Sequence, residues 1–292
     1  MDYLKFDDAN RLAFVHHPPA RRDAPSFVFV NALTGSTDHW ETTVAPRLRD
    51  AGFGTLSYNF RGQSDSDFGP DVALTPDLIV ADLVALMAHV SPARPIVVGL
   101  SIGGLFAAEA IKCGMAAEAL VLLNTLREIG PRISWINDAL PTLVGHGGVA
   151  LFMDAIMPLL VNPEFAATLR PRALAGAYAP MDPGHGHMNL MRHSVAANWA
   201  FDWSGLRLPV LNITGLHDRV FLDRDVVDRL IALLPDARRL DWDDAGHLLP
   251  LERPEKLADA LAAFGTEIAN RPVGQTGIDD PASGATSARA RP

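Results

Sequence analysis

One serine in the sequence has the neighbours that a catalytic nucleophile needs. Ser101 stands in the run GLSIG at 99–103, between an apolar run that ends at Val98 and a helix-like run of Ala, Leu and Phe. A sharp turn from a strand into a helix exposes such a serine at a helix N-terminus, but it crowds the positions two residues before and after. Glycine at both positions relieves that crowding. Because a serine hydroxyl is a weak nucleophile without a base, the chain must also supply a base and an acid.

An acid and a histidine follow in the second half of the chain. Asp218 comes just after the apolar run LPVLNITG, and His247 lies between the last expected strand and the last expected helix. Loops at the carboxyl ends of parallel strands meet at one edge of a sheet, so these residues can converge with Ser101. In that arrangement His247 accepts the Ser101 proton, and Asp218 fixes the imidazole tautomer and stabilises its cation. Ser101, Asp218 and His247 are the predicted catalytic triad.

The elements that must position these residues alternate along the chain. Short apolar runs followed by helical patterns are typical of a mostly parallel sheet covered by helices. A hairpin is expected around the turn at residues 7–10, and further strands are expected at 26–31, 54–60, 96–98, 119–124, 208–215 and 237–242. Helices are expected from Thr75, which can cap a helix whose first turn holds Pro76, and also after Ser101, at 223–234 and at 254–269.

This alternation breaks between residues 127 and 200. Irregular helical pieces are expected there, divided by Pro131, Pro141, Pro158, Pro163 and Pro171. We therefore expect an α/β core formed by residues 1–126 and 201–270, with residues 127–200 inserted as a helical lid. Residues 271–292 are rich in Gly, Ser, Ala and Pro, and a disordered tail is expected there.

The composition excludes several classes of protein. A net charge of −9 without a basic cluster argues against a nucleic-acid partner. The single cysteine, Cys113, allows no intrachain disulfide and no cysteine-rich zinc site. The N-terminus has no signal pattern, and we see no apolar stretch of the roughly 18 to 20 residues that a membrane-spanning helix needs. A soluble, cytoplasmic protein without a membrane partner is the prediction.

The motifs together resemble the α/β-hydrolase fold family over about residues 3–269. The resemblance rests on VNALTGSTDHW, YNFRGQSDSD, VGLSIGG, ITGLHD and AGHLLPLERPE. It implies an α/β-hydrolase fold, in which a mostly parallel twisted sheet has helices on both faces and an inserted helical lid. It also implies an oxyanion hole formed by the backbone N–H groups of Leu33 and Ile102, with no cofactor. Where the family has His-Gly before the oxyanion residue, this chain has Asn31-Ala32.

Several chemistries share this scaffold, and the nucleophile narrows the choice. Ser101 favours hydrolysis of carboxylic esters or lactones, and Asn124 stands where some relatives keep the acid, a role that Asp218 makes unnecessary. The stretch NALTG resembles enol-lactonases and their carboxylesterase relatives, and it also resembles homoserine O-acetyltransferases. An acyltransferase is therefore the alternative, because both reactions pass through an acyl-Ser101 intermediate. A perhydrolase and a non-catalytic ligand-binding protein on the same scaffold are further alternatives.

The lid is expected to select the substrate. It is rich in apolar and aromatic side chains, which favours a small-to-medium, largely apolar small molecule. The candidate substrate contacts are Asn31, Trp135, Met153, Met157, Trp199 and Leu248. Five lid arginines are candidates to bind a substrate carboxylate, although such arginines are usually solvated: Arg127, Arg132, Arg170, Arg172 and Arg192. The lid histidines fit no zinc signature, so no metal site is predicted.

Overall fold

A single eight-stranded sheet forms the centre of the molecule, in the strand order β1-β2-β4-β3-β5-β6-β7-β8. The computed structural model describes residues 1–271, so the predicted tail lies outside the described residues apart from Arg271. The antiparallel pairs are β1–β2 and β2–β4, and every pair from β4 to β8 is parallel. The strands are β1 Asp2–Lys5, β2 Arg11–His17, β3 Ser26–Val30, β4 Gly54–Tyr58, β5 Pro95–Leu100, β6 Ala119–Leu123, β7 Val210–Gly215 and β8 Ala237–Trp242. The predicted mostly parallel sheet is confirmed.

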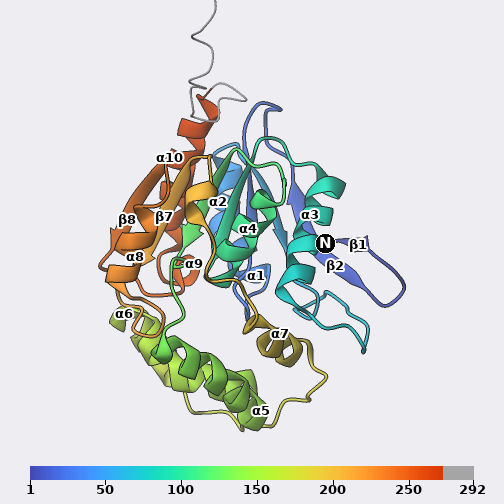
Figure 1. Cartoon of the computed structure of the whole chain (residues 1–292), viewed down its shortest axis with the longest axis vertical. Coiled ribbons are helices and arrows are strands. Elements are labelled where there is room, and N and C mark those ends of the chain that lie inside the picture. Colours follow the sequence, from blue (N-terminus) through green and yellow to red (C-terminus); the bar gives the residue numbers. More distant parts are fainter. Residues whose placement is uncertain (272–292) are drawn as a thin grey trace, which may run out of the picture.

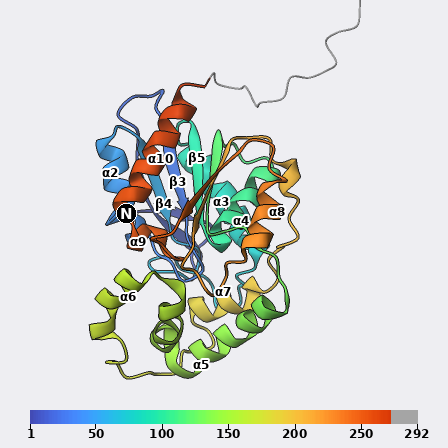
Figure 2. The same ribbon diagram turned by 90° about the vertical axis from the view of Figure 1, so that its left-hand side faces the viewer.

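Helices cover both faces of this sheet, as Figures 1 and 2 show. One face packs against α3 (Pro76–Val90), α4 (Ile102–Lys112) and α8 (Arg224–Ile231). The other packs against α1 (Asp38–Glu41), α2 (Val44–Asp50), α9 (Leu249–Glu252) and α10 (Pro254–Ala269). Every residue of β3, β4, β6 and β7 is buried. Accordingly β3 after Ser26 and all of β6 are continuous apolar runs, whereas β4 and β7 also bury polar side chains: Thr55, Ser57, Asn212 and Thr214. The expected cap of α3 is present, since the Thr75 side chain accepts a hydrogen bond from the Leu78 N–H.

The chain between β6 and β7 forms helices beyond the carboxyl ends of the strands (Figures 1 and 2). They are α5 (Pro131–Leu160), α6 (Pro163–Leu169), the 3₁₀ helix η1 (Arg170–Arg172) and α7 (Gly186–Ser194). The 3₁₀ helix η2 (Trp203–Gly205) follows, with Trp203 buried in the apolar core on the α3, α4 and α8 face of the sheet. The core and lid boundaries at residues 126 and 201 stay predictions.

The expectation that no stretch is long and apolar enough to span a membrane is wrong for α5. By length and composition alone, this helix could cross one. The sequence has no uninterrupted apolar run of that length here, but α5 is apolar on average while it carries scattered polar residues. Only 22% of its most apolar stretch is buried. Gly148, with φ 72° and ψ −177°, kinks α5, so it is not a straight rod. The absence of a membrane partner stays a prediction.

Candidate active site

Ser101 occupies the turn between β5 and α4 with φ 57° and ψ −124°, a backbone conformation that is costly for a residue with a side chain. Two glycines permit the close packing of this turn. A Cβ atom on Gly99 would lie 2.3 Å from the Gly104 Cα, and one on Gly103 would lie 2.4 Å from the Asn31 carbonyl oxygen. The turn puts the Ser101 side chain at the N-terminus of α4, where unpaired amides and the helix dipole favour negative charge.

His247 and Asp218 are paired beside this turn. The His247 Nδ1 lies 2.6 Å from the Asp218 Oδ2, and both side chains are buried. The other carboxylate oxygen, Oδ1, accepts hydrogen bonds from the backbone N–H groups of Val220 at 3.0 Å and Phe221 at 2.9 Å. Burial by itself raises the pKa of Asp218, but the attraction and hydrogen bond of His247, together with the Phe221 N–H and the charge of Arg127, hold that pKa below its ordinary value. Asp218 is therefore a carboxylate at neutral pH, able to stabilise an imidazolium.

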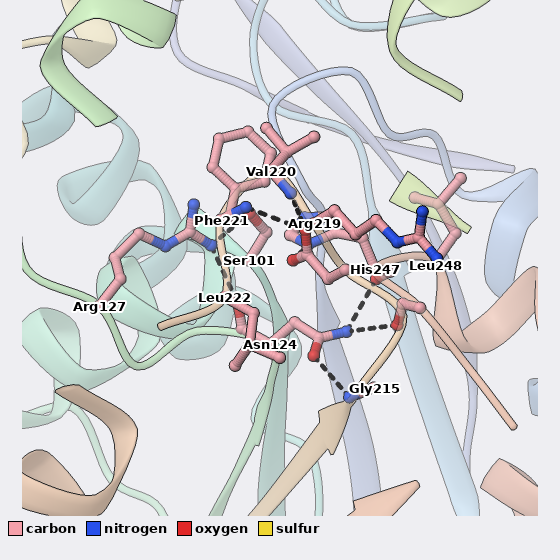
Figure 3. Close-up of polar contacts among 12 residues, drawn as sticks. Ser101, Asn124, Arg127, Gly215, Arg219, Val220, Phe221, Leu222, His247 and Leu248 are labelled. Carbon is pink, nitrogen blue, oxygen red and sulfur yellow. Dashed lines mark hydrogen bonds and ion pairs between the residues drawn. The ribbon is translucent and has the colours of Figure 1, made fainter. Parts of the chain in front are cut away.

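The Ser101 hydroxyl is engaged by an arginine. Its Oγ accepts a hydrogen bond of 2.9 Å from the Arg127 Nη2, and Figure 3 shows the two side chains facing each other. Within residues 1–271 no hydrogen bond joins Ser101 Oγ to His247, although both side chains line the same cavity. Catalytic hydrogen bonds often form only once substrate is bound, so this geometry is compatible with His247 as the base.

The two predicted oxyanion donors flank the same cavity. Leu33 and Ile102 both line it, and neither backbone N–H donates a hydrogen bond within residues 1–271. Ile102 is the first residue of α4, where an amide has no partner inside the helix. Both amides are therefore available to an oxygen that develops negative charge.

The polar side chains around the Leu33 loop form hydrogen bonds with one another and with the backbone. Asn31 donates through Nδ2 to the Tyr58 carbonyl at 3.0 Å and to Gln63 Oε1 at 2.9 Å, and its Oδ1 accepts from Trp40 Nε1 at 2.7 Å. Gln63 Nε2 in turn donates to the carbonyl oxygens of Ala32 at 2.9 Å and Leu33 at 3.1 Å. Asn31-Ala32, which replaces the family's His-Gly, is thus part of a buried polar network that fixes the orientation of the loop.

Asn124 joins three parts of the site, a role that the sequence reading missed. Its Nδ2 donates to the carbonyl oxygens of Gly246 and His247, each at 3.0 Å, and its Oδ1 accepts from the Gly215 N–H at 2.8 Å (Figure 3). It adopts a positive φ of 50°, which asparagine tolerates better than most residues. One side chain therefore connects the ends of β6 and β7 to the loop that carries His247.

Glu252 was also missed, and it holds the same loop from the other side. Its buried carboxylate accepts hydrogen bonds of 2.8 Å from the N–H groups of Gly246 and Leu248, on either side of His247. It also accepts from the backbone and side chain of Asn162, both at 2.7 Å, just before α6. Within the loop, the His247 N–H donates to the Leu160 carbonyl at 2.6 Å. The sequence signal was a glutamate five residues after His247, which by itself does not reveal its partners.

The cavity at this site has a volume of about 120 Å³. That volume corresponds to roughly 8 to 12 water-sized positions, so it suits a small ligand. Both halves of α5 contribute apolar side chains to it, together with the core residues Ser101, Leu33 and His247. Among the candidate contacts, Met153, Trp199 and Leu248 line this cavity.

The other three candidate contacts do not line it, and each has a physical reason. The polar atoms of the Asn31 side chain already form hydrogen bonds in the buried network around the Leu33 loop. Trp135 is 78% exposed, because it lies on the outer side of α5. Met157 lines a second cavity beside α6, of about 510 Å³. Helical position alone did not distinguish the inner side of the lid from the outer.

Arg127 is the lid arginine that reaches the candidate nucleophile, Ser101. It is 5% exposed, and its guanidinium carbon lies 4.6 Å from the ring centroids of both Trp199 and Phe221. Burial lowers the pKa of Arg127 to about 10, against the opposing attraction of Asp218, so the guanidinium is still charged at neutral pH. The other four lid arginines are exposed: Arg132, Arg170, Arg172 and Arg192. Among residues 1–271 no group of three or more His, Cys, Asp or Glu side chains is placed to hold a metal ion.

Comparison with known proteins identifies the family of the chain. A model of the alpha/beta hydrolase family matches residues 27–260. A proposed carbamate hydrolase, RutD, of Escherichia coli O127:H6 is 25% identical over 246 residues, which cover 82% of this chain and 90% of that protein. A malate-bound thermophilic esterase from Thermogutta terrifontis is 20% identical with a TM-score of 0.73, and the alignment covers 92% of this chain and 100% of that one. The enol-lactonase from Burkholderia xenovorans LB400 is 22% identical with a TM-score of 0.70 and the same coverage. These two solved structures share the fold.

Proposed function

We propose that this chain, which belongs to the alpha/beta hydrolase family, cleaves carboxylic esters or lactones of small substrates through an acyl-Ser101 intermediate. The observation that carries the proposal is the buried pair of His247 and Asp218 beside a serine on a strand-to-helix turn. The named relatives add support, because esterases, lactonases and carbamate hydrolases all act on an acyl carbon bonded to a heteroatom.

The first stage forms the acyl-enzyme. Ser101 Oγ attacks the substrate carbonyl carbon while His247 Nε2 accepts its proton, since Nδ1 is held by Asp218. The negative charge that develops on the carbonyl oxygen is received by the N–H groups of Leu33 and Ile102. The carbonyl then reforms, the bond to the leaving oxygen breaks, and His247 returns its proton to the leaving alcohol.

The second stage releases the acid. Water enters as the alcohol leaves, His247 removes a proton from it, and the hydroxide attacks the acyl carbon. The ester bond to Ser101 breaks, and the proton returns from His247 to Ser101 Oγ. An acyltransferase would follow the same steps with an alcohol in place of water. The small apolar cavity supports a short acyl group in either case.

Hydrolysis of p-nitrophenyl esters with acyl chains from acetate to octanoate tests the proposal. We expect the shortest chains to be preferred, and we expect Ser101→Ala to remove essentially all turnover while the protein stays folded. Ser134→Ala, an exposed serine on α5, is the matched control and should keep wild-type activity. Activity that survives in Ser101→Ala would exclude Ser101 as the nucleophile. Addition of homoserine should leave the rate of acid release unchanged, whereas an acyltransferase would form the acylated amino acid instead.

A further inference from the structure

Arg127 is a buried cation without an ion-pair partner in the described structure. Within residues 1–271 it forms no salt bridge, although its side chain is almost fully buried. Asp218 attracts it, but that carboxylate is already committed to His247 and to two backbone N–H groups. Buried charges are normally paired with an opposite charge, because removal from water is costly. A guanidinium left in this state is suited to receive an anion from outside the chain.

The contacts around Arg127 orient the guanidinium and leave part of it free. Nη2 donates to the Asn124 carbonyl at 2.8 Å and to Ser101 Oγ at 2.9 Å, and Nε donates to the Thr125 carbonyl at 3.3 Å. The rings of Trp199 and Phe221 stack on the group. No hydrogen bond from Nη1 is present within residues 1–271, and Arg127 lines the cavity. Its unused N–H groups are therefore available in the space that holds the substrate.

We propose that Arg127 binds a carboxylate of the substrate, so that the natural ester or lactone is a small acid with its carboxylate close to the scissile carbonyl. This inference rests on the proposed function. A guanidinium matches a carboxylate in shape and charge, and its charge-assisted hydrogen bonds are the strong kind. Because Nη2 lies 2.9 Å from Ser101 Oγ, an anion on this group sits beside the nucleophile. The cavity of about 120 Å³ limits the chain between the carboxylate and the carbonyl to a few atoms.

A matched pair of substrates tests the proposal. In p-nitrophenyl hemisuccinate a carboxylate ends the acyl chain, and in p-nitrophenyl 4-methylpentanoate an isopropyl group of similar shape replaces it. After correction for spontaneous hydrolysis, we expect kcat/KM of the wild type to favour the anionic ester about 10- to 100-fold, the range of a hydrogen bond to a charged group. Arg127→Met should remove that preference, and Arg127→Lys should keep part of it.

The control variant is Arg192→Met, which removes the same charge from an exposed lid position and should leave the preference unchanged. A wild type that prefers the neutral ester would overturn the proposal, while Ser101-dependent hydrolysis of that ester would leave the proposed function standing. An Arg127→Met variant that loses hydrolysis of the anionic and the neutral ester equally would also overturn it. The loss would then reflect the contact of Arg127 with Ser101 rather than with a substrate carboxylate.

Binding without turnover provides an independent measurement. Monomethyl succinate should bind to Ser101→Ala in a ligand-observed NMR titration, and the additional change Arg127→Met should abolish that binding. If the wild type hydrolyses neither ester but this binding is seen, the proposed function fails and the carboxylate site stands. If monomethyl succinate does not bind to Ser101→Ala, the carboxylate site is refuted, whatever the esters show.

Discussion

At the scale of single residues, the site depends on which atoms of His247 and Ser101 are already occupied. Asp218 holds Nδ1 of His247, so Nε2 is the nitrogen that can act as base. Arg127 donates to Ser101 Oγ, so the proposed mechanism requires the hydroxyl to turn toward His247 when substrate binds. The carboxylate of Asp218 is kept ionised by its pairing with His247, despite burial. In the proposed mechanism Asp218 orients His247, and His247 accepts the proton.

Replacement of Asp218 by asparagine should therefore impair catalysis without removing the nucleophile. An amide can donate to Nδ1 and so favour the wrong imidazole tautomer, and it carries no charge to stabilise the imidazolium. We expect kcat to fall by about 10⁴-fold, the loss measured for the equivalent change in a serine protease. Steady-state kinetics on the preferred p-nitrophenyl ester would measure it. Asp223→Asn, at the cap of α8, is the control, and equal losses in the two variants would count against Asp218 as the orienting acid.

At the scale of elements, Glu252 joins the lid to the loop that carries His247, and Asn124 joins that loop to the sheet. Glu252 of α9 accepts from Gly246, Leu248 and Asn162, and Asn124 connects that loop to the ends of β6 and β7. The His247 N–H also bonds to Leu160 at the end of α5. The loop that carries His247 and the end of α5 are therefore held together by the same buried polar contacts.

Glu252→Gln should lower both stability and turnover. The glutamine amide has one acceptor oxygen where the carboxylate has two, so at least one buried N–H of the loop loses its partner. We expect a loss of about 1–3 kcal/mol in the free energy of unfolding, the cost of an unsatisfied buried group. Urea denaturation measures that loss, and kcat should fall more than KM rises. Glu255→Gln, on the exposed surface of α10, should change neither quantity, and a similar effect in both variants would refute the assignment.

At the scale of the whole molecule, the sheet is a rigid base and the lid closes one edge of it. The two faces of the sheet have separate apolar cores, formed with α3, α4 and α8 on one side and with α2 and α10 on the other. The kink at Gly148 lets both halves of α5 contribute to one cavity. The cavity therefore belongs to neither layer alone, since core and lid residues share its wall.

Global stability should also depend on Glu109, on the helix behind Ser101. Burial, with repulsion from Asp77, raises the pKa of Glu109 from 4.5 to about 7. A carboxyl whose pKa is raised on folding favours the native state while protonated, so this contribution is lost as pH rises from about 4.5 through 7. Glu109→Gln should therefore raise the melting temperature at pH 8 and change it little at pH 4. A pH-independent effect in thermal melts would show that the charge is not responsible, and esterase activity should be unchanged.

Local patterns were enough to anticipate the fold class and the order of the candidate triad. Periodicity of apolar residues reports burial, and small residues around Ser101 report a tight turn; both are properties of neighbours in the chain. The capped helix from Thr75 and the fully buried strands follow from the same kind of information. Membership of the alpha/beta hydrolase family agrees with that reading.

What the tertiary structure alone decided is the set of contacts between residues distant in sequence. Arg127 and Ser101 are 26 positions apart, and Asn162 and Glu252 are 90 apart, so no local pattern predicts that they touch. The same holds for the inner side of the lid, where Met153 and Trp199 line the cavity and Trp135 does not. The sequence by itself determined the order of strands and helices in the core and the tight turn at Ser101, because these follow from the preferences of residues that are neighbours in the chain. The pairing of buried polar groups depends on how distant elements pack, and only the folded chain supplies it.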